Sequence, residues 1–410
     1  MVLYAALTTI PQLLDRLIVG REYDLAVQYG EVENPQIVTY VGAAISVVLV
    51  GASVLILGKL LRRVLLRPSL LALALITIVL SLLVFHGADG ITLPFVAVNL
   101  VAFAALSTLR PDLSDLRVFA HVGAVIAVGS ILLAVISPEI AYRSGSLGGV
   151  DTKAIIGTGI LAGPYPSSNN LGMSMALALP FVFLIPGRKL RAFELAAMAL
   201  ALIMSASRSS IAAVLAAGLA ILILKGVRAG IERRVAYQFG MVVVGLIAAL
   251  TPWFVTSRGL FTNRGAIWIG SRELLIERDW LAGVGTAAYA LEGSVNQASG
   301  VLAPGGHNVL LHYWVVAGLP GLVAMAVLLL AIMRAGQWSL ETSLVPAGFV
   351  LTLMVLAAVE MPLRPDFIIA PAWVAAPAVA VLLAAAKQER LDRLALSPRL
   401  DWQRRSRRQV

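Results

Sequence analysis

The sequence contains no cysteine. This absence excludes disulfide bonds, cysteine–zinc sites and thiol nucleophiles in the chain. Charged residues are also scarce: they make up 13% of the 410 residues, whereas ordinary soluble domains carry roughly 25%. Histidine occurs only four times. A chain with so few charges is not expected to fold as a soluble enzyme, and each histidine becomes a candidate for a specific role.

Long apolar runs fill most of the chain, which is 59% hydrophobic. Runs of about 17–25 apolar residues predict helices that cross a bilayer. We therefore expect an all-α, polytopic transmembrane helical bundle of about eleven or twelve spans. The expected spans are 37–57, 70–85, 91–109, 118–136, 171–185, 192–204, 211–224, 237–255, 309–333, 345–360 and 368–386.

The spans divide the chain into regions. Residues 1–36 are expected to form an N-terminal outer or interfacial segment, because Pro11, Asp15 and Arg16 interrupt its apolar start. No cleavable signal peptide is expected, since no small-residue cleavage site follows, and a further crossing by residues 1–20 stays open. Residues 37–386 form the predicted transmembrane domain, which includes a large loop at 256–306, and residues 387–410 form a basic tail.

Basic residues are distributed unevenly between alternate loops. The chain has 32 Lys and Arg against 22 Asp and Glu, and most of the basic residues lie in one set of alternate loops together with the tail. The positive-inside rule assigns that set to the cytoplasm and the 137–170 and 256–306 segments to the outer face. This predicts an inner (cytoplasmic) membrane protein whose polar outer face is periplasmic. The net charge of +10 is then explained by anionic lipid headgroups, without nucleic acid.

One outer-face stretch combines a polar turn, a histidine and a long apolar run: Gly305-Gly306-His307-Asn308 precedes the span that begins near residue 309. A histidine with an ordinary pKa of about 6.5 can accept a proton at neutral pH. The positive end of the following helix favours the neutral, basic form. Helix capping and interface anchoring, without chemistry, is the alternative interpretation. Further along, Gly318 and Gly321 are small residues that another backbone can approach closely.

Arg208 lies in a short turn between two predicted spans, among serines. An arginine at this depth is costly, so a functional partner is the default expectation. Free backbone N–H groups at the start of the next helix, serine hydroxyls and a guanidinium together predict an anion site, with phosphate favoured. The alternative is an interfacial arginine that extends to the lipid headgroups. The hydroxyls concerned belong to Ser205, Ser207, Ser209 and Ser210.

The large outer loop contains a second candidate arginine. The spacing of apolar residues predicts an amphipathic helix over 264–278, lying on the outer membrane surface with Trp268 on its apolar face. Arg264 would then occupy the first helical turn, where a cation is disfavoured, so we expect it to serve a ligand. Arg272 adds positive charge to the same helix, although a solvated charged face explains it equally well.

Several other polar residues lie near the ends of predicted spans. Glu360, Arg364 and Asp366 suggest an ion pair that lines an outer cavity, whereas Asn99 and His121 are expected to be packed and hydrogen-bonded. The outer loops have no Asp-x-Asp pair and no histidine cluster. We therefore expect no divalent metal held between carboxylates, and no cofactor.

Three of these motifs, in order, resemble the O-antigen ligase family of membrane glycosyltransferases. The first is the arginine turn, Ser-x-Ser-Arg208-Ser-Ser. The second is Arg264 with Trp268, followed by a Trp…Gly-x-Gly stretch. The third is His307-Asn308, followed after nine residues by Gly318-Leu-Pro-Gly321. The resemblance covers about residues 165–335. The family resemblance does not separate ligases from O-antigen polymerases, teichuronic acid enzymes or pilin-type oligosaccharyltransferases, which share the architecture.

The resemblance implies metal-independent, inverting transfer of a glycan from an undecaprenyl (polyprenyl) diphosphate carrier to an envelope acceptor, which in ligases is the lipid A core. By this likeness His307 would be the general base, and Arg208 and Arg264 would stabilise the diphosphate leaving group. A polysaccharide polymerase is the near alternative, and a transporter of lipid-linked glycans is the alternative of another class. The residues expected to contact substrate are Ser207, Ser209, Ser210, Asn308, Trp268, Arg272 and Arg364.

Overall fold

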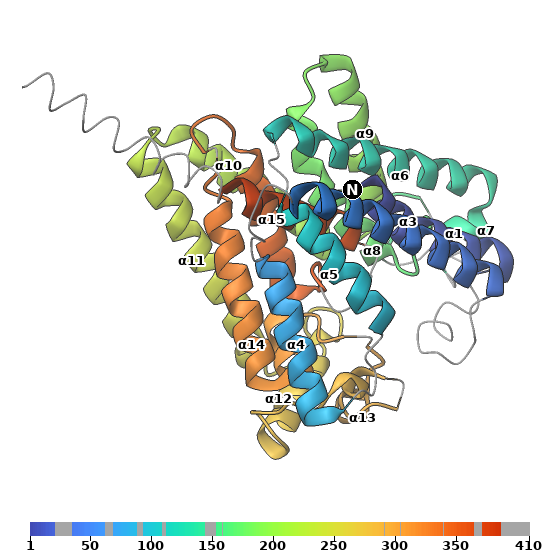
Figure 1. The fold of residues 1–410 in the computed structure, drawn as a ribbon, viewed down its shortest axis with the longest axis vertical. Helices are drawn as coiled ribbons and strands as arrows, with labels where there is room; N and C mark the ends of the chain where they lie inside the picture. Colours follow the sequence, from blue (N-terminus) through green and yellow to red (C-terminus); the bar gives the residue numbers. More distant parts are fainter. Residues whose placement is uncertain are drawn as a thin grey trace, which may run out of the picture.

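The computed structural model describes residues 1–20, 35–61, 69–87, 93–108, 112–143, 153–157, 159–290, 292–303, 305–338, 340–364 and 371–386. These ranges are predominantly helical and contain no strand, so the predicted all-α polytopic bundle is confirmed (Figure 1). Asp366 and the basic tail at 387–410 lie outside the described residues.

The predicted spans form helices close to their predicted bounds, and further helices lie at the N-terminus and in the polar segments. They are α1 (Val2–Val19), α3 (Gln36–Leu61), α4 (Leu70–His86), α5 (Leu93–Ser107), α6 (Arg117–Ile136), α7 (Pro138–Ala141), α8 (Ser168–Ala178), α9 (Arg188–Met204), α10 (Arg208–Gly226), α11 (Ile231–Phe254), α12 (Arg264–Glu277), α13 (Ser294–Ser299), α14 (Val309–Ala335), α15 (Val345–Val359) and a last helix, Ala372–Ala386. Short 3₁₀ helices are η1 (Leu113–Leu116), η2 (Leu179–Leu184) and η3 (Thr286–Tyr289).

Six of the helices in the described ranges are long and apolar enough to cross a membrane, and shorter apolar helices accompany them. One of the six is α1. Residues of α1 such as Tyr4 and Leu7 are buried, and α1 packs against α3. This packing favours a further crossing by residues 1–20 over an interfacial segment.

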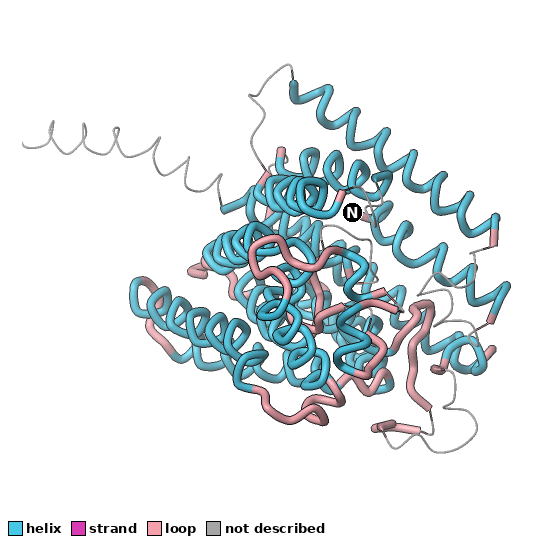
Figure 2. The backbone as a smooth tube through the Cα atoms, turned by 90° about the horizontal axis from the view of Figure 1, so that it is seen from below, coloured by secondary structure: helices cyan, strands magenta, loops and turns pink. Residues whose placement is uncertain are grey.

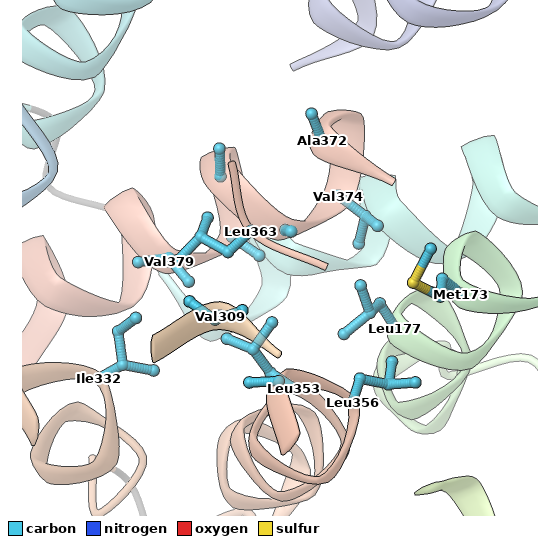
Figure 3. Packing of buried hydrophobic residues seen from close by; sticks show 14 of the residues in the cluster. Met173, Leu177, Val309, Ile332, Leu353, Leu356, Leu363, Ala372, Val374 and Val379 are labelled. Carbon is cyan, nitrogen blue, oxygen red and sulfur yellow. The ribbon is translucent and has the colours of Figure 1, made fainter. Parts of the chain in front are cut away.

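The core of the bundle is formed by α15 and the last helix, whose residues are almost all buried. Helix α15 packs against α8, α10, α11 and α14. Figure 3 shows Leu353 and Leu356 of α15 close to Val374 and Val379 of the last helix and to Leu177 of α8. Because α15 is central, the residue that ends it can contact several neighbouring helices at once.

Helix α14 is broken in its N-terminal half, which a single span over 309–333 did not predict. Ala317 and Gly318 have non-helical backbone angles, and Gly318 has φ 62°. The backbone groups freed by this kink find new partners: Leu319 N donates to Leu281 O at 3.0 Å, and Ser81 Oγ donates to Ala317 O at 2.8 Å. A Cβ on Gly318 would overlap Leu281 O. The expected close approach of another backbone at this glycine is confirmed.

The 256–306 segment folds over one end of the bundle. In Figure 1, α12 and α13 lie around the lower ends of α4 and α14, and Figure 2 looks at the molecule from that side. Helix α12 has nearly its predicted bounds, but its packing differs from the prediction. Trp268, Ile267 and Leu275 are buried inside the protein, and α12 packs against α13 and α11. The apolar face of α12 therefore covers the bundle and does not lie on the membrane surface.

Candidate functional site

The polar centre of the structure is Glu360, which directly follows α15. It is the only charged residue between Glu341 and Arg364 in the sequence, and its side chain is 2% exposed. Its N–H donates to Leu356 O at 2.7 Å, which closes the last turn of α15. A buried carboxylate is costly unless charged groups and hydrogen bonds compensate it. Glu360 must therefore have several partners.

Three other segments supply those partners. The Arg264 guanidinium from α12 forms a short ion pair with Glu360 Oε1. The Ser209 hydroxyl from α10 donates to the same oxygen at 2.7 Å. On the other oxygen, His307 Nδ1 lies 3.1 Å from Glu360 Oε2. One carboxylate thus joins the predicted catalytic residues Arg264 and His307 and one of the predicted serines.

The partners of Glu360 stand at the starts of helices. Arg264 is the first residue of α12, Ser209 is the second residue of α10, and His307 directly precedes Asn308, the N-cap of α14. Each helix start carries partial positive charge from unpaired N–H groups. The meeting of these ends makes the surroundings of Glu360 electropositive, which suits a buried carboxylate and any further anion nearby.

This environment sets the ionisation of Glu360. Burial by itself raises the pKa of the Glu360 carboxyl, but the hydrogen bond with His307 and the charge of Arg264 outweigh it, and Ser209 adds to them, so the pKa lies below its ordinary value. An ionised carboxylate can only accept hydrogen bonds. His307 Nδ1 must therefore be the donor, which leaves Nε2 with its lone pair in the neutral ring. The His307 side chain is 25% exposed, so Nε2 can be approached from outside the protein.

The backbone at His307 is unusual. Its φ of 46° lies in the left-handed region, which a residue with a β-carbon rarely adopts. Asn308 stabilises the following helix: its Oδ1 accepts from Leu311 N at 2.9 Å, and its Nδ2 donates to Ala248 O and Ala358 O. Trp268 Nε1 donates to Gly306 O at 2.9 Å. Asn308 and Trp268 are both buried, so the prediction that they contact substrate is corrected: they hold the segment that carries His307.

The serines at the start of α10 have different surroundings, since Ser209 bonds to Glu360 and others are buried. Ser207 and Ser210 are fully buried, and Ser207 Oγ donates to Ser210 Oγ at 2.8 Å. Their hydroxyls lie within the protein, which corrects their assignment as substrate contacts. Arg208, the first residue of α10, is exposed. Within the described ranges no residue forms an ion pair or hydrogen bond with its guanidinium, so Arg208, which directly precedes Ser209, remains available for a ligand.

The two remaining predicted substrate contacts, Arg272 and Arg364, interact with other groups. The Arg272 guanidinium donates to Trp253 O and to Val255 O, at the C-terminal end of α11, where a cation is favoured. Its partners give Arg272 a structural role, and its contact with substrate stays a prediction. Arg364 acts electrostatically on the Tyr289 hydroxyl, while the charges that act on Glu360 are those of Arg264 and His307. The suggested pairing of Glu360 with Arg364 is thus replaced by these two partners.

The interpretation of Asn99 as a packed, hydrogen-bonded residue is confirmed. His121 is hydrogen-bonded as expected, but its side chain is 46% exposed and is not packed in the core. Tyr4 OH donates to the fully buried Asn99 at 2.6 Å. His121 Nδ1 lies 2.7 Å from Glu194 Oε1, between α6 and α9. Among the described residues no arginine bonds to this second His–Glu pair, which therefore offers a control for the first.

The lowered pKa of Glu360 predicts how the stability of the protein changes with pH. Because its pKa is lowered in the folded protein, its ionisation stabilises the fold fully above its ordinary pKa of 4.5, and this contribution is lost as the pH falls through the lowered value. We expect Glu360→Gln to unfold at a lower temperature than the wild type at pH 7, by an amount that stays constant down to about pH 4.5 and shrinks in stronger acid. Thermal unfolding in detergent at a series of pH values would measure the difference. A difference that widens in acid would contradict the prediction, and Glu341→Gln, at a half-exposed ion pair with Arg234, is the control.

Within the part of the chain that the structure describes, no three His, Cys, Asp or Glu side chains come together as a metal-binding group. Comparison of the chain with protein-family models, with curated proteins and with solved structures finds no match.

Proposed function

We propose that this chain is a membrane glycosyltransferase that moves a glycan from a polyprenyl diphosphate carrier to a hydroxyl group of an envelope acceptor. The observation that carries the proposal is the shared carboxylate of Glu360, which orients His307 and pairs with Arg264. Arg208, next in the chain to the Glu360 partner Ser209, has no partner among the described residues. A general base, an ordered cation and an unpaired cation at one partly exposed place are what this transfer needs.

The electrostatics favour a diphosphate over a neutral ligand. Arg264 and Glu360 compensate each other, so Arg208 and the helix starts leave the cluster with an excess of positive charge. When the glycosidic bond to the carrier breaks, negative charge grows on the diphosphate oxygen. Cations and N–H groups that are already in place stabilise that charge without reorganising.

The proposed reaction is a single displacement. His307 Nε2 takes the proton of the acceptor hydroxyl, whose oxygen forms a bond to the anomeric carbon of the donor sugar. The bond between that carbon and the diphosphate oxygen breaks, and its electron pair leaves with the polyprenyl diphosphate. Protonated His307 is stabilised by Glu360, as in other base–carboxylate pairs. Attack opposite the leaving group inverts the anomeric centre, and no metal or cofactor takes part.

The proposed location follows from the charge distribution and the apolar helices. We place the protein in the inner membrane with the Glu360 cluster at the periplasmic side and the basic tail in the cytoplasm. If α1 is a crossing, the N-terminus is cytoplasmic as well. The lipid-linked donor would then reach the cluster from the outer leaflet, and the acceptor would be a glycolipid or glycan of the envelope.

The test uses the full chain in proteoliposomes with a polyprenyl-diphosphate glycan, extracted envelope acceptors and EDTA. We expect transfer in EDTA, and the mass of the product would distinguish a ligase from a polymerase. Arg208→Ala is expected to lower the rate roughly 100-fold without changing the unfolding temperature, because no described residue depends on its guanidinium. Arg228→Ala, on the basic side of the bundle, is the control. Movement of the donor across the bilayer with no transfer to any acceptor would overturn the proposal and favour a transporter.

A further inference from the structure

The residue before His307 has no room for a side chain. A Cβ on Gly306 would lie 2.8 Å from the Tyr289 hydroxyl oxygen and 3.1 Å from His312 Cα and Cβ. A Cβ on Gly305 would lie 2.7 Å from Met361 Sδ. The segment that leads to His307 therefore passes through a tightly packed channel of side chains, and its path is determined by them.

Both polar groups of the Gly306 backbone are bonded to buried side chains. Gly306 N–H donates to His312 Nδ1 at 3.3 Å, and Gly306 C=O accepts from Trp268 Nε1 at 2.9 Å. His312 is 2% exposed and Trp268 is fully buried. An N–H group in such surroundings cannot turn to water if its acceptor is removed. The two bonds hold the peptide unit from opposite sides.

His312 is itself held firmly. Its N–H donates to Asn308 O at 2.9 Å in the first turn of α14. Its ring stacks on Tyr289, with centroids 5.0 Å apart and planes at 30°, and meets the edge of Tyr313 at 5.1 Å. Burial raises the pKa of Tyr289 despite the hydrogen bond with Ser271 and the charge of Arg364, so the phenol keeps its proton. Because Nδ1 accepts the Gly306 N–H, the ring carries no proton on that nitrogen.

The left-handed backbone of His307 explains why the two hydrogen bonds to Gly306 are needed. A side chain with a β-carbon at φ 46° tends to relax unless the surrounding structure holds it. The Asn308 cap fixes the start of α14 but makes no bond to Gly306. The bond to His312 is the one that ties the preceding peptide to the helix, and through it the direction of the His307 ring toward Glu360.

We propose that His312 is a positioning residue for the transfer reaction, whose unprotonated Nδ1 holds the Gly306 N–H so that His307 keeps its reactive geometry. The proposal rests on the proposed function, in which His307 is the base. His312 is buried and does not touch substrate. Its effect should therefore fall on the rate of the chemical step and not on donor binding.

Two variants test separately the hydrogen-bond acceptor Nδ1 and the aromatic ring of His312. His312→Phe keeps the aromatic stack on Tyr289 but removes the acceptor, whereas His312→Asn loses the ring and keeps an oxygen close to the position of Nδ1. We expect His312→Phe to lower kcat roughly 100-fold with little change in the KM for the donor. We expect His312→Asn to recover most of that loss. An equal loss in both variants together with an equal fall in unfolding temperature would mean a merely structural role and would overturn the proposal.

A second measurement does not depend on activity. Hydrogen exchange of the peptide that contains Gly306, measured by mass spectrometry in detergent, should be slow in the wild type and in His312→Asn and at least about tenfold faster in His312→Phe. Unchanged exchange and unchanged kcat in His312→Phe would overturn the proposal. If the wild type transfers no glycan, the proposed function fails, while the exchange experiment still decides whether His312 holds Gly306.

Discussion

His307→Asn is expected to lower glycan transfer by roughly 10²–10⁴-fold, the usual contribution of a general base, while the donor still binds. Asparagine suits this position because it tolerates the left-handed backbone that His307 adopts at φ 46°. Its amide can also donate to Glu360, as His307 Nδ1 does. The substitution therefore removes the free lone pair of Nε2 and little else. Initial rates with the lipid-linked donor, together with donor binding to the purified variant, would measure the effect.

The control is the second His–Glu pair of the chain. His121→Asn removes a histidine that is also bonded to a carboxylate, at 2.7 Å from Glu194, but far from Glu360 in the sequence and on other helices. We expect its transfer rate to stay close to that of the wild type. A rate for His307→Asn within about threefold of the wild type would fall well short of a general base's contribution and would remove His307 from that role.

The sequence predicted the helices well because each span is an apolar run bounded by polar residues. Helix α10 shows both the success and its limit: the run over 211–224 was predicted, whereas the helix begins at Arg208. The kink in α14 was not predicted, because it depends on Leu281 O and Ser81, which approach from distant parts of the chain. Glycine and proline near residue 318 were a local signal for a break, but they do not specify its geometry.

The candidate site was found in part, and the reason is again physical. Arg208, Arg264 and His307 could be identified locally, since a charged or titratable side chain at a membrane boundary needs an explanation. The common partner of Arg264 and His307 could not be identified in this way. Glu360 was visible as an isolated acid after an apolar run, but pairing it with Arg264 and His307 requires the arrangement of α10, α12 and α15, and uniformly apolar helices do not encode which faces meet.

The burial of Trp268 and Asn308 was misjudged for a related reason. A helix with one apolar face has the same periodicity whether that face meets lipid or protein. The sequence therefore could not show that α12 turns Trp268 inward onto Gly306. Asn308 was expected near substrate because it follows His307. Its three hydrogen bonds, to α14, Ala248 and Ala358, depend on the packing of α11 and α15.

Glu360→Gln is expected to reduce transfer by about three orders of magnitude or more, because base–carboxylate pairs lose this much when the carboxylate becomes an amide and the ring orientation is lost. The same change should destabilise the protein by about 3–5 kcal/mol, since it leaves the Arg264 charge buried without its partner. Arg264 is 13% exposed and Glu360 is 2% exposed, so water cannot replace the lost pair fully. Unfolding in detergent and transfer rates would measure both effects.

The double variant Glu360→Gln with Arg264→Gln separates the two roles of Glu360. Removing both charges should restore much of the stability, because a neutral pair of similar volume leaves no uncompensated charge in the interior. Activity should stay lost, because His307 then lacks the carboxylate that fixes its tautomer and the site lacks one cation. Recovery of activity together with stability would show that Glu360 serves the fold alone, and His307 would have to act as a base without an orienting partner.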